Sequence, residues 1–158
     1  MVKENFHSDG WLLINKPQGI ESFGVIRKLK FRYSFKKIGF AGTLDPLASG
    51  LLLVGINKAT KKIPNIHQEK KSYEVEIRFG ASTNTLDSEG RFFKMESSSH
   101  NINERVSHLK KFIGTYQQKI PDFSAHKLNG KNFYELARDN KVIEDRYKKV
   151  SVQSLKVL

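Results

Sequence analysis

The chain is 158 residues long, the size of one ordinary domain, and 38% of its residues are hydrophobic. It contains no cysteine, so disulfides and thiolate zinc sites are excluded. Lys and Arg number 28 against 16 Asp and Glu, and the resulting formal charge of +12 favours polyanionic partners such as RNA or DNA.

The lysines are spread along the chain in pairs and form no dense basic tail. This distribution predicts a folded basic surface, although a lysine-rich composition without a binding role is the alternative. No apolar stretch approaches the ~20 residues of a membrane span, and the polar N-terminal residues do not resemble a secretory signal. We therefore expect a soluble protein of the cytoplasm. The pairs are Lys36-Lys37, Lys61-Lys62, Lys70-Lys71, Lys110-Lys111 and Lys148-Lys149.

The first elements are a strand and a helix. Trp11 to Asn15 is apolar and predicts a strand, which ends in a turn at Lys16-Pro17-Gln18-Gly19 because Pro and Gly break strand pairing. Ser22 is expected to cap a helix over roughly Phe23 to Arg32. One face of that helix would carry Val25, Ile26 and Leu29.

A glycine-rich loop over residues 39–50 presents one carboxylate, Asp45, ahead of the apolar strand Leu51 to Val54. An acid held in this way is either a catalytic group or a group that bonds turn backbone nitrogens. Spacing alone slightly favours the turn. Beyond the strand, Asn57 is expected to cap a short helix that Pro64 disturbs.

Residues 72–79 alternate apolar and polar side chains and predict a half-buried strand. Tyr73 lies on its apolar side. Its ring next to Lys70 and Lys71 is suited to stacking on a base, but a core position explains it better by pattern. Arg91 to Met95 is expected to pair as a returning strand.

The second half predicts a helix over Asn101 to Ile113, with a capping box at Asn101 and Glu104 and a stop at Gly114. The elements that follow are a tight turn at Asn129-Gly130, a helix over Lys131 to Arg138 and a last strand over Tyr147 to Leu158. Strands and helices alternate without a βαβ rhythm. The predicted class is therefore α+β, with a mixed, largely antiparallel sheet and flanking helices.

Several common chemistries have no motif in this chain. It has no phosphate-binding loop and no nucleophile elbow, which argues against nucleotide-driven chemistry and serine hydrolysis. Its five histidines show no metal-ligand spacing. Asp87-Ser88-Glu89-Gly90 resembles a calcium loop only superficially and predicts a turn.

A basic segment interleaved with aromatic residues starts at Phe123-Ser124-Ala125-His126-Lys127. Such a mixture suits contact with an RNA backbone together with base stacking. An amphipathic helix preceded by a turn explains it almost as well. The segment continues through Lys131, Phe133, Tyr134 and Arg138.

Residues 42–50 read Gly-Thr-Leu-Asp-Pro-Leu-Ala-Ser-Gly, which is the most specific block of the chain. Other blocks are Leu13-Ile14-Asn15-Lys16-Pro17, Lys58-Ala59-Thr60-Lys61, Lys71-Ser72-Tyr73, the loop Thr83 to Gly90, Phe123 to Lys127 and Tyr134 to Arg138. Taken in order, these blocks resemble the TruB family of tRNA pseudouridine synthases, of the bacterial type. The resemblance covers nearly all of the chain after residue 10 and implies a pseudouridine synthase-like fold.

This resemblance implies isomerisation of a uridine in the T-arm of tRNA, on a flipped base, by an enzyme that needs no metal and no organic cofactor. Asp45 would be the catalytic nucleophile or charge stabiliser, and Tyr73 would stack on the uracil and help remove the C5 proton. The resemblance also implies that tRNA is the partner and that the enzyme is a monomer. Substrate-binding positions would be Lys16, Phe40, Gly42, Thr43, Lys127, Lys131 and Arg138.

The chain departs from the family pattern in two places. Phe40 stands where the family commonly has His, so it can stack or wedge but cannot donate a hydrogen bond. The family's arginine partner of the catalytic aspartate belongs to a segment beyond the matched region. We therefore expect residues 1–158 to be a catalytic domain without its C-terminal segment or a PUA domain. The alternative is an RNA-binding protein of the same fold that is non-catalytic or catalytically impaired.

Overall fold

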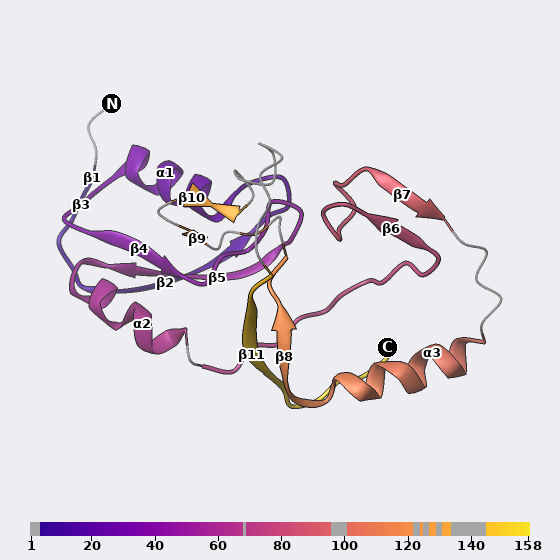
Figure 1. Ribbon diagram of the computed structural model, residues 1–158. Helices are drawn as coiled ribbons and strands as arrows, with labels where there is room; N and C mark the ends of the chain where they lie inside the picture. The colour runs from indigo at the N-terminus through magenta and orange to yellow at the C-terminus, as the bar shows by residue number, and fades with distance from the viewer. Residues whose placement is uncertain are drawn as a thin grey trace. The chain divides into compact units, whose positions relative to one another are not determined.

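The computed structural model describes residues 4–67, 69–95, 101–121, 124, 127–128, 131–133 and 145–158 (Figure 1). The chain divides into two units, Met1–Val75 and Glu76–Leu158, and each is described by itself. In these ranges no helix is long and apolar enough to cross a membrane.

A three-stranded antiparallel sheet forms the centre of the first unit. Strand β5 (Gly50–Ile56) lies between β2 (Gly10–Lys16) and β4 (Ile38–Ala41). Its register pairs Ile14 with Leu52, and both Leu12 and Phe40 with Val54. Alternation along β5 therefore gathers apolar side chains from all three strands on one face of the sheet.

Helix α1 (Ser22–Arg32) covers this face. Val25 and Ile26 from the helix and Leu52 and Val54 from β5 form the buried core, each at most 7% exposed. The predicted apolar helix face and both predicted apolar strands are thus confirmed. Partly buried residues around this core are Leu12, Ile14, Ile20, Leu29, Ile38 and Phe40.

Shorter elements complete the first unit. Strand β1 (Glu4–Phe6) runs parallel to β3 (Tyr33–Phe35), which follows α1 directly. After β5 the chain forms the 3-10 helix η1 (Asn57–Lys62) and the short helix α2 (Ile63–Ile66), whose first turn contains Pro64.

Within the described ranges, the second unit consists of two-stranded antiparallel pairs, an α-helix with a 3-10 helix directly after it, and the helical residue Phe133. Strand β6 (Ala81–Thr83) pairs with β7 (Phe92–Met95), and β8 (Gly114–Lys119) pairs with β11 (Tyr147–Val152). Helix α3 (Ile102–Leu109) continues into the 3-10 helix η2 (Lys110–Phe112). Strands β9 (Lys127–Leu128) and β10 (Lys131–Asn132) pair on either side of the predicted Asn129-Gly130 turn, which itself lies outside the described residues.

Two capping predictions are wrong and one is confirmed. Ser22 lies inside α1, and the N-cap is Glu21, whose side chain makes no capping hydrogen bond. Asn57 opens η1 with a positive φ of 52°, and its side chain bonds the backbone of other segments instead. Asn101 does cap α3, because its side chain accepts a hydrogen bond from the Asn103 amide.

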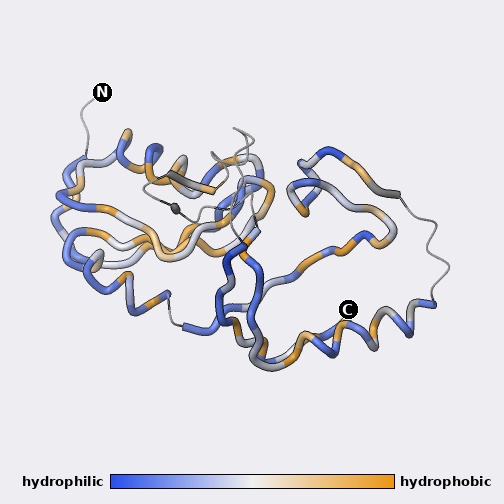
Figure 2. Tube along the Cα trace, viewed as in Figure 1, coloured by the Kyte–Doolittle hydropathy of each residue, from blue (hydrophilic) through white to orange (hydrophobic). Residues whose placement is uncertain are grey.

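One predicted strand is wrong, and one predicted helix starts later than expected. Residues 71–78 form an exposed, extended segment with no strand pairing, although their hydropathy alternates clearly in Figure 2. Strand β7, predicted to return along this segment, pairs with β6 instead. The helix predicted over Lys131 to Arg138 starts later than expected: Lys131 and Asn132 form strand β10, Phe133 is helical, and residues 134–138 lie outside the described residues.

These elements belong to the α+β class, with antiparallel pairing in all described sheets except β1–β3. The expected single sheet is divided among five small sheets in the described part of the chain. The three-stranded sheet β2–β5–β4, which packs against α1, carries the loop that contains Asp45.

Candidate active site

The Asp45 loop connects the antiparallel strands β4 and β5. Gly42 and Gly50, at its two ends, have φ values of +77° and +134°. Both values lie in the region where a side chain would be strained, so glycine is the residue that suits each end of this reversal. The Asp45 carbonyl accepts a hydrogen bond from the Ala48 amide (3.1 Å), which closes a turn inside the loop.

Ser22 anchors the loop to the first turn of α1. Its hydroxyl accepts a hydrogen bond from the Leu44 amide (2.9 Å) and donates one to the Leu44 carbonyl (3.0 Å). Ser22 is 2% exposed, so water does not compete for these bonds. The residue immediately before Asp45 is therefore fixed through both of its backbone polar groups.

A second anchor comes from the turn after β2. The Gly19 amide donates to the carbonyl of Pro46 (2.8 Å), which follows Asp45 directly. That turn is itself fixed by Lys16, whose ammonium donates to the carbonyls of Pro17 (3.0 Å) and Ile20 (2.8 Å). The Lys16 residue is 0% exposed. In this conformation Lys16 thus supports the turn and reaches a substrate only indirectly.

The Asp45 side chain projects from this fixed backbone into solvent. In the part of the chain that the structure describes, no hydrogen bond and no ion pair engages its carboxylate. The turn is closed by the carbonyl of Asp45, and the side chain does not bond backbone nitrogens. The alternative in which the Asp45 side chain bonds turn backbone nitrogens is therefore wrong. An exposed carboxylate without a partner is what nucleophilic or charge-stabilising chemistry requires.

The other predicted residues of this loop differ in exposure. Thr43, two residues before Asp45, is exposed, and Gly42 is half-buried. Phe40 lies in β4 opposite Val54 and packs against the core under α1. Its ring is thus partly used in packing.

Tyr73 is 71% exposed and lies in the extended segment after α2. The core position considered for it is wrong. No hydrogen bond or ring contact joins Tyr73 to the rest of the described chain. Its predicted role beside a substrate base stays a prediction.

The predicted basic contacts lie in the second unit. Lys127 in β9 pairs with Asn132, and Lys131 in β10 pairs with Leu128, so the two lysines belong to one antiparallel pair of strands. Arg138 lies outside the described residues.

The loop between β6 and β7 is held by its own polar side chains. Asp87 accepts hydrogen bonds from the Thr85 hydroxyl and the Glu89 amide (3.0 Å), and Asn84 accepts one from the Arg91 amide (2.8 Å). The predicted turn is confirmed, and the described residues contain no group of three metal-ligating side chains.

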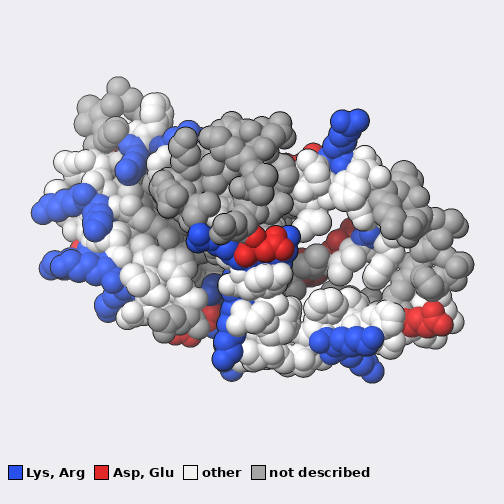
Figure 3. Space-filling model, in the orientation of Figure 1, with Lys and Arg blue, Asp and Glu red and all other residues white. Residues whose placement is uncertain are grey.

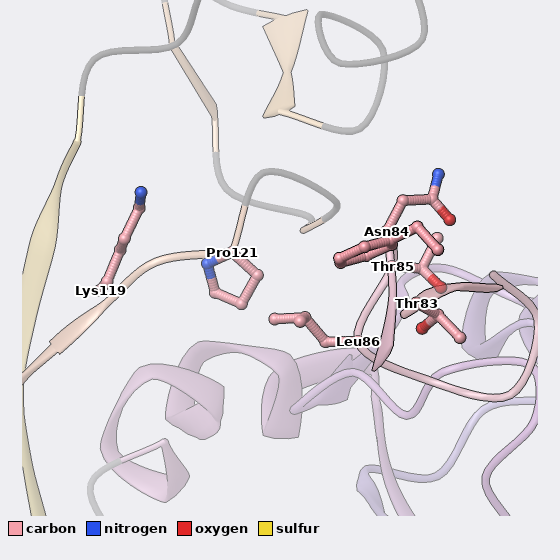
Figure 4. A pocket seen from close by; sticks show the side chains of 7 residues that line it. Thr83, Asn84, Thr85, Leu86, Lys119 and Pro121 are labelled. Atoms are coloured by element: carbon pink, nitrogen blue, oxygen red, sulfur yellow. The ribbon is translucent and has the colours of Figure 1, made fainter. Parts of the chain in front are cut away.

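A shallow pocket of about 280 Å³ lies beside this loop, within the second unit (Figure 4). Leu86 points into it toward Pro121. No carboxylate or histidine lines the pocket, so it lacks an acid–base group. Its lining residues are Thr83, Asn84, Thr85, Leu86, Phe93, Lys119 and Pro121.

Comparison with known proteins gives this loop its context. The model of the TruB family of pseudouridylate synthases, N-terminal domain, matches residues 29–158. The chain belongs to the TruB family.

It is 40% identical over 150 residues to a protein of Aquifex aeolicus (strain VF5), and the match covers 95% of this chain and 52% of the relative. It is 39% identical over 149 residues to a protein of Ruegeria sp. (strain TM1040), with 94% and 49% covered. A protein of Bartonella quintana (strain Toulouse) is 36% identical over 149 residues, with 94% and 55% covered.

All three relatives are named tRNA pseudouridine synthase B. The chain spans about half the length of these TruB relatives. Asp45, Tyr73, Lys127 and Lys131 all fall in the region that the family model matches.

The residues that fix the Asp45 loop lie mainly before the region that the family model matches. Ser22, Gly19 and Lys16 precede residue 29, where the family match begins. Sequence reasoning assigned Ser22 to a helix cap and found no part for Gly19 beyond a turn. A partner 22 positions away leaves no local signal in a single sequence.

Proposed function

We propose that this chain isomerises a uridine in the T-arm of tRNA to pseudouridine, in the cytoplasm, with Asp45 as the catalytic carboxylate. In this reaction the N1–C1′ bond breaks, a C5–C1′ bond forms, the C5 proton leaves and N1 gains a proton. The observation that carries the proposal is the exposed Asp45 carboxylate on a loop whose neighbouring residues are fixed by Ser22 and Gly19. The names of the TruB relatives agree with this reaction.

Asp45 has two chemically reasonable routes. Its carboxylate either attacks C1′ of the ribose and displaces the uracil, or adds to C6 of the uracil ring. In the first route the carboxylate leaves C1′ when C5 bonds to that carbon. In the second it leaves C6 after C5 has bonded to C1′, when the C5 proton is lost and the C5–C6 double bond re-forms. The reaction consumes no oxidant and transfers no external group, so the proposal includes no cofactor.

The uridine has to leave its stack before Asp45 can reach it, which costs a few kcal/mol. We propose that Tyr73 offsets part of this free-energy cost, because its exposed ring is available for stacking on the base. The formal charge of +12 attracts the tRNA backbone and speeds the encounter. Lys127, Lys131 and Arg138 are our candidates for phosphate contacts.

A second candidate function is RNA binding without isomerisation. It is favoured by one observation: no arginine pairs with Asp45 among the residues that the structure describes. An aspartate without a guanidinium partner loses charge-assisted orientation. In this second candidate function, the basic surface binds RNA and no uridine is isomerised.

The test measures release of tritium from C5 of uridine in a T-arm stem-loop, together with binding of the same RNA. The wild-type chain should release tritium, and Asp45→Asn should lower the rate by orders of magnitude at unchanged affinity. Asp9→Asn is the matched control, since Asp9 is bound to the Lys58 amide away from the loop. Zero release from both the wild type and Asp45→Asn, with RNA still bound, would support the second candidate.

A further inference from the structure

Three aromatic side chains lie together on one face of the β1–β3 pair. Parallel pairing places Phe6 beside Phe35, and Tyr33 two residues away on the same face. The ring centroids are 5.7 Å apart for Phe6–Phe35, 6.0 Å for Tyr33–Phe35 and 6.3 Å for Phe6–Tyr33. We call these three residues the aromatic platform.

The platform is separate from the core of its unit and remains open to solvent. Phe6 is 38% exposed, and Tyr33 and Phe35 are half-buried. None of the three belongs to the cluster packed between α1 and the sheet. The rings are thus covered in part by one another, at interplanar angles of 53–74°, and the uncovered part of each ring leaves apolar surface for a partner.

The segment that carries two of the three rings is rich in positive charge. Residues 27–37 contain six Lys and Arg and no Asp or Glu, and all six cations are exposed. The Arg32 guanidinium lies over the Tyr33 ring, 5.7 Å from its centroid. Acids also occur here: Glu4 is opposite Tyr33, and Glu21 is 4.0 Å from Arg27. Figure 3 shows Lys and Arg side chains gathered at the left edge, over the end of the first unit that carries β1 and β3.

The platform is also held in place. The Asn57 side chain accepts a hydrogen bond from the Lys37 amide (3.1 Å) and donates to the carbonyls of Phe6 (3.3 Å) and Ser8 (2.9 Å). These bonds tie the end of β1 to the turn after β3. A surface that is already ordered loses less conformational freedom when it binds a ligand.

We propose that the aromatic platform binds unpaired nucleotides of RNA. Bases would stack on the rings of Tyr33 and Phe35 while Arg32, Lys36 and Lys37 contact phosphates. Single-stranded RNA fits better than duplex, because a duplex hides the faces of its bases. The inference rests on the proposed function for the identity of the RNA as tRNA, and adds a contact separate from the Asp45 loop.

The test compares binding of a short single-stranded RNA of mixed sequence with binding of its duplex, by fluorescence anisotropy. The double variant Tyr33→Leu/Phe35→Leu keeps apolar side chains and removes the stacking surfaces. It should weaken single-strand binding about tenfold, because one stacked base contributes about 1–3 kcal/mol. Duplex binding should change by less than about twofold, because it depends on charge.

Phe112→Leu is the matched control, since Phe112 is an exposed ring next to Lys110 and Lys111 in the other unit. It should leave single-strand binding unchanged. Lys36→Ala/Lys37→Ala should weaken binding of both RNAs. Equal effects of the double variant on single strand and duplex, or no effect on either, would overturn the proposal. Binding to phosphatidylserine vesicles is measured as well, because anionic lipid is the other partner that an aromatic and basic surface suits. If the double variant lost vesicle binding and kept RNA binding, the proposal would also be overturned.

A second measurement on the wild type covers the case in which the double variant fails to fold. Single-stranded RNA containing 4-thiouridine should crosslink to residues 31–37 on irradiation, and crosslinks only elsewhere would contradict the platform. Neither measurement requires isomerisation. An inactive chain that still crosslinks at the platform would therefore refute the proposed function alone, and an active chain that does not would refute this inference alone.

Discussion

The exposure of the Asp45 carboxylate follows from the way its loop is fixed. Backbone groups and the Ser22 hydroxyl make the hydrogen bonds that hold the loop, so the aspartate side chain has no structural task there. If the Asp45 carboxylate itself accepted hydrogen bonds from backbone amides of the turn, it would not be free to react with a substrate. Rigidity around an unengaged functional group is the arrangement that keeps a catalytic side chain in position.

Ser22→Ala tests this arrangement. The substitution leaves both backbone polar groups of Leu44 without their buried partner, so we expect the free energy of unfolding to fall by about 1–3 kcal/mol. Isomerisation should slow more than RNA binding weakens, because the loop loses its position. Urea unfolding followed by Trp11, the single tryptophan, reports on this unit. Ser34→Ala, at an exposed serine of β3, should have almost no effect, and equal effects of the two variants would contradict the role of Ser22.

Tyr73→Phe separates stacking from proton transfer. The ring that stacks on a base is kept and the hydroxyl is removed, so RNA affinity should stay within about twofold. Turnover should fall at least about tenfold if the hydroxyl helps remove the C5 proton. Tyr147→Phe, at another exposed tyrosine, is the control. A collapse of affinity in Tyr73→Phe would show that the hydroxyl is a binding or structural group.

At the scale of elements, Asn57 connects segments that lie far apart in the sequence. It is 8% exposed and bonds the backbone of both residues 6–8 and Lys37. Its positive φ is tolerated by asparagine better than by most residues. Strands β1 and β3 are short, so this single side chain does much to keep them in place.

We therefore expect Asn57→Ala to lower the free energy of unfolding by about 2–3 kcal/mol, through lost hydrogen bonds and the strain of alanine at positive φ. Asn65→Ala, at an exposed asparagine of α2, should change it by less than about 0.5 kcal/mol. Thermal and urea unfolding monitored by Trp11 measure both variants. Similar values for the two would show that Asn57 does not hold β1 and β3.

Local patterns predicted the strongest elements and missed the weak ones. Strands β2 and β5 have apolar runs, and α1 has an apolar face, because each buries side chains in the core. Strands β1, β3 and β4 are only three or four residues long and carry no such signal. Their pairing depends on Asn57 and on β5, which a local window of sequence does not contain.

The segment 72–79 shows the limit of alternation. Its pattern reports which side chains prefer burial, but a strand also requires a partner with free backbone groups. Residues 72–78 pair with no strand in the described part of the chain, and Tyr73, Val75, Ile77 and Phe79 remain 41–71% exposed. For the candidate site, the motif predicted Asp45 and both glycines, whereas the anchor Ser22 depended on tertiary contact.

At the scale of the whole molecule, the proposed encounter with RNA depends on charge. The excess of 12 positive charges is distributed along the chain, and exposed lysines and arginines occur in both units. Such a surface holds an RNA backbone by displacing its counterions, which makes binding salt-dependent. Affinity should therefore fall steeply as salt rises, whatever the fate of the uridine.

The lysines of β9 and β10 supply a quantitative test. If Lys127 and Lys131 each contact a phosphate, Lys127→Ala and Lys131→Ala should each reduce the slope of log affinity against log salt by about 0.7–0.9. Lys156→Ala, at an exposed lysine near the end of the chain, should leave the slope unchanged. Unchanged slopes in the first two variants would remove these lysines from the RNA footprint.

The most direct measurement of the central claim is single-turnover formation of pseudouridine in a T-arm stem-loop, quantified by mass spectrometry after nuclease digestion. The account predicts conversion of one uridine by the wild-type chain, with a rate that falls by orders of magnitude in Asp45→Asn while the RNA stays bound. Conversion at the same rate in Asp45→Asn would contradict it, because the carboxylate would then have no part in the reaction.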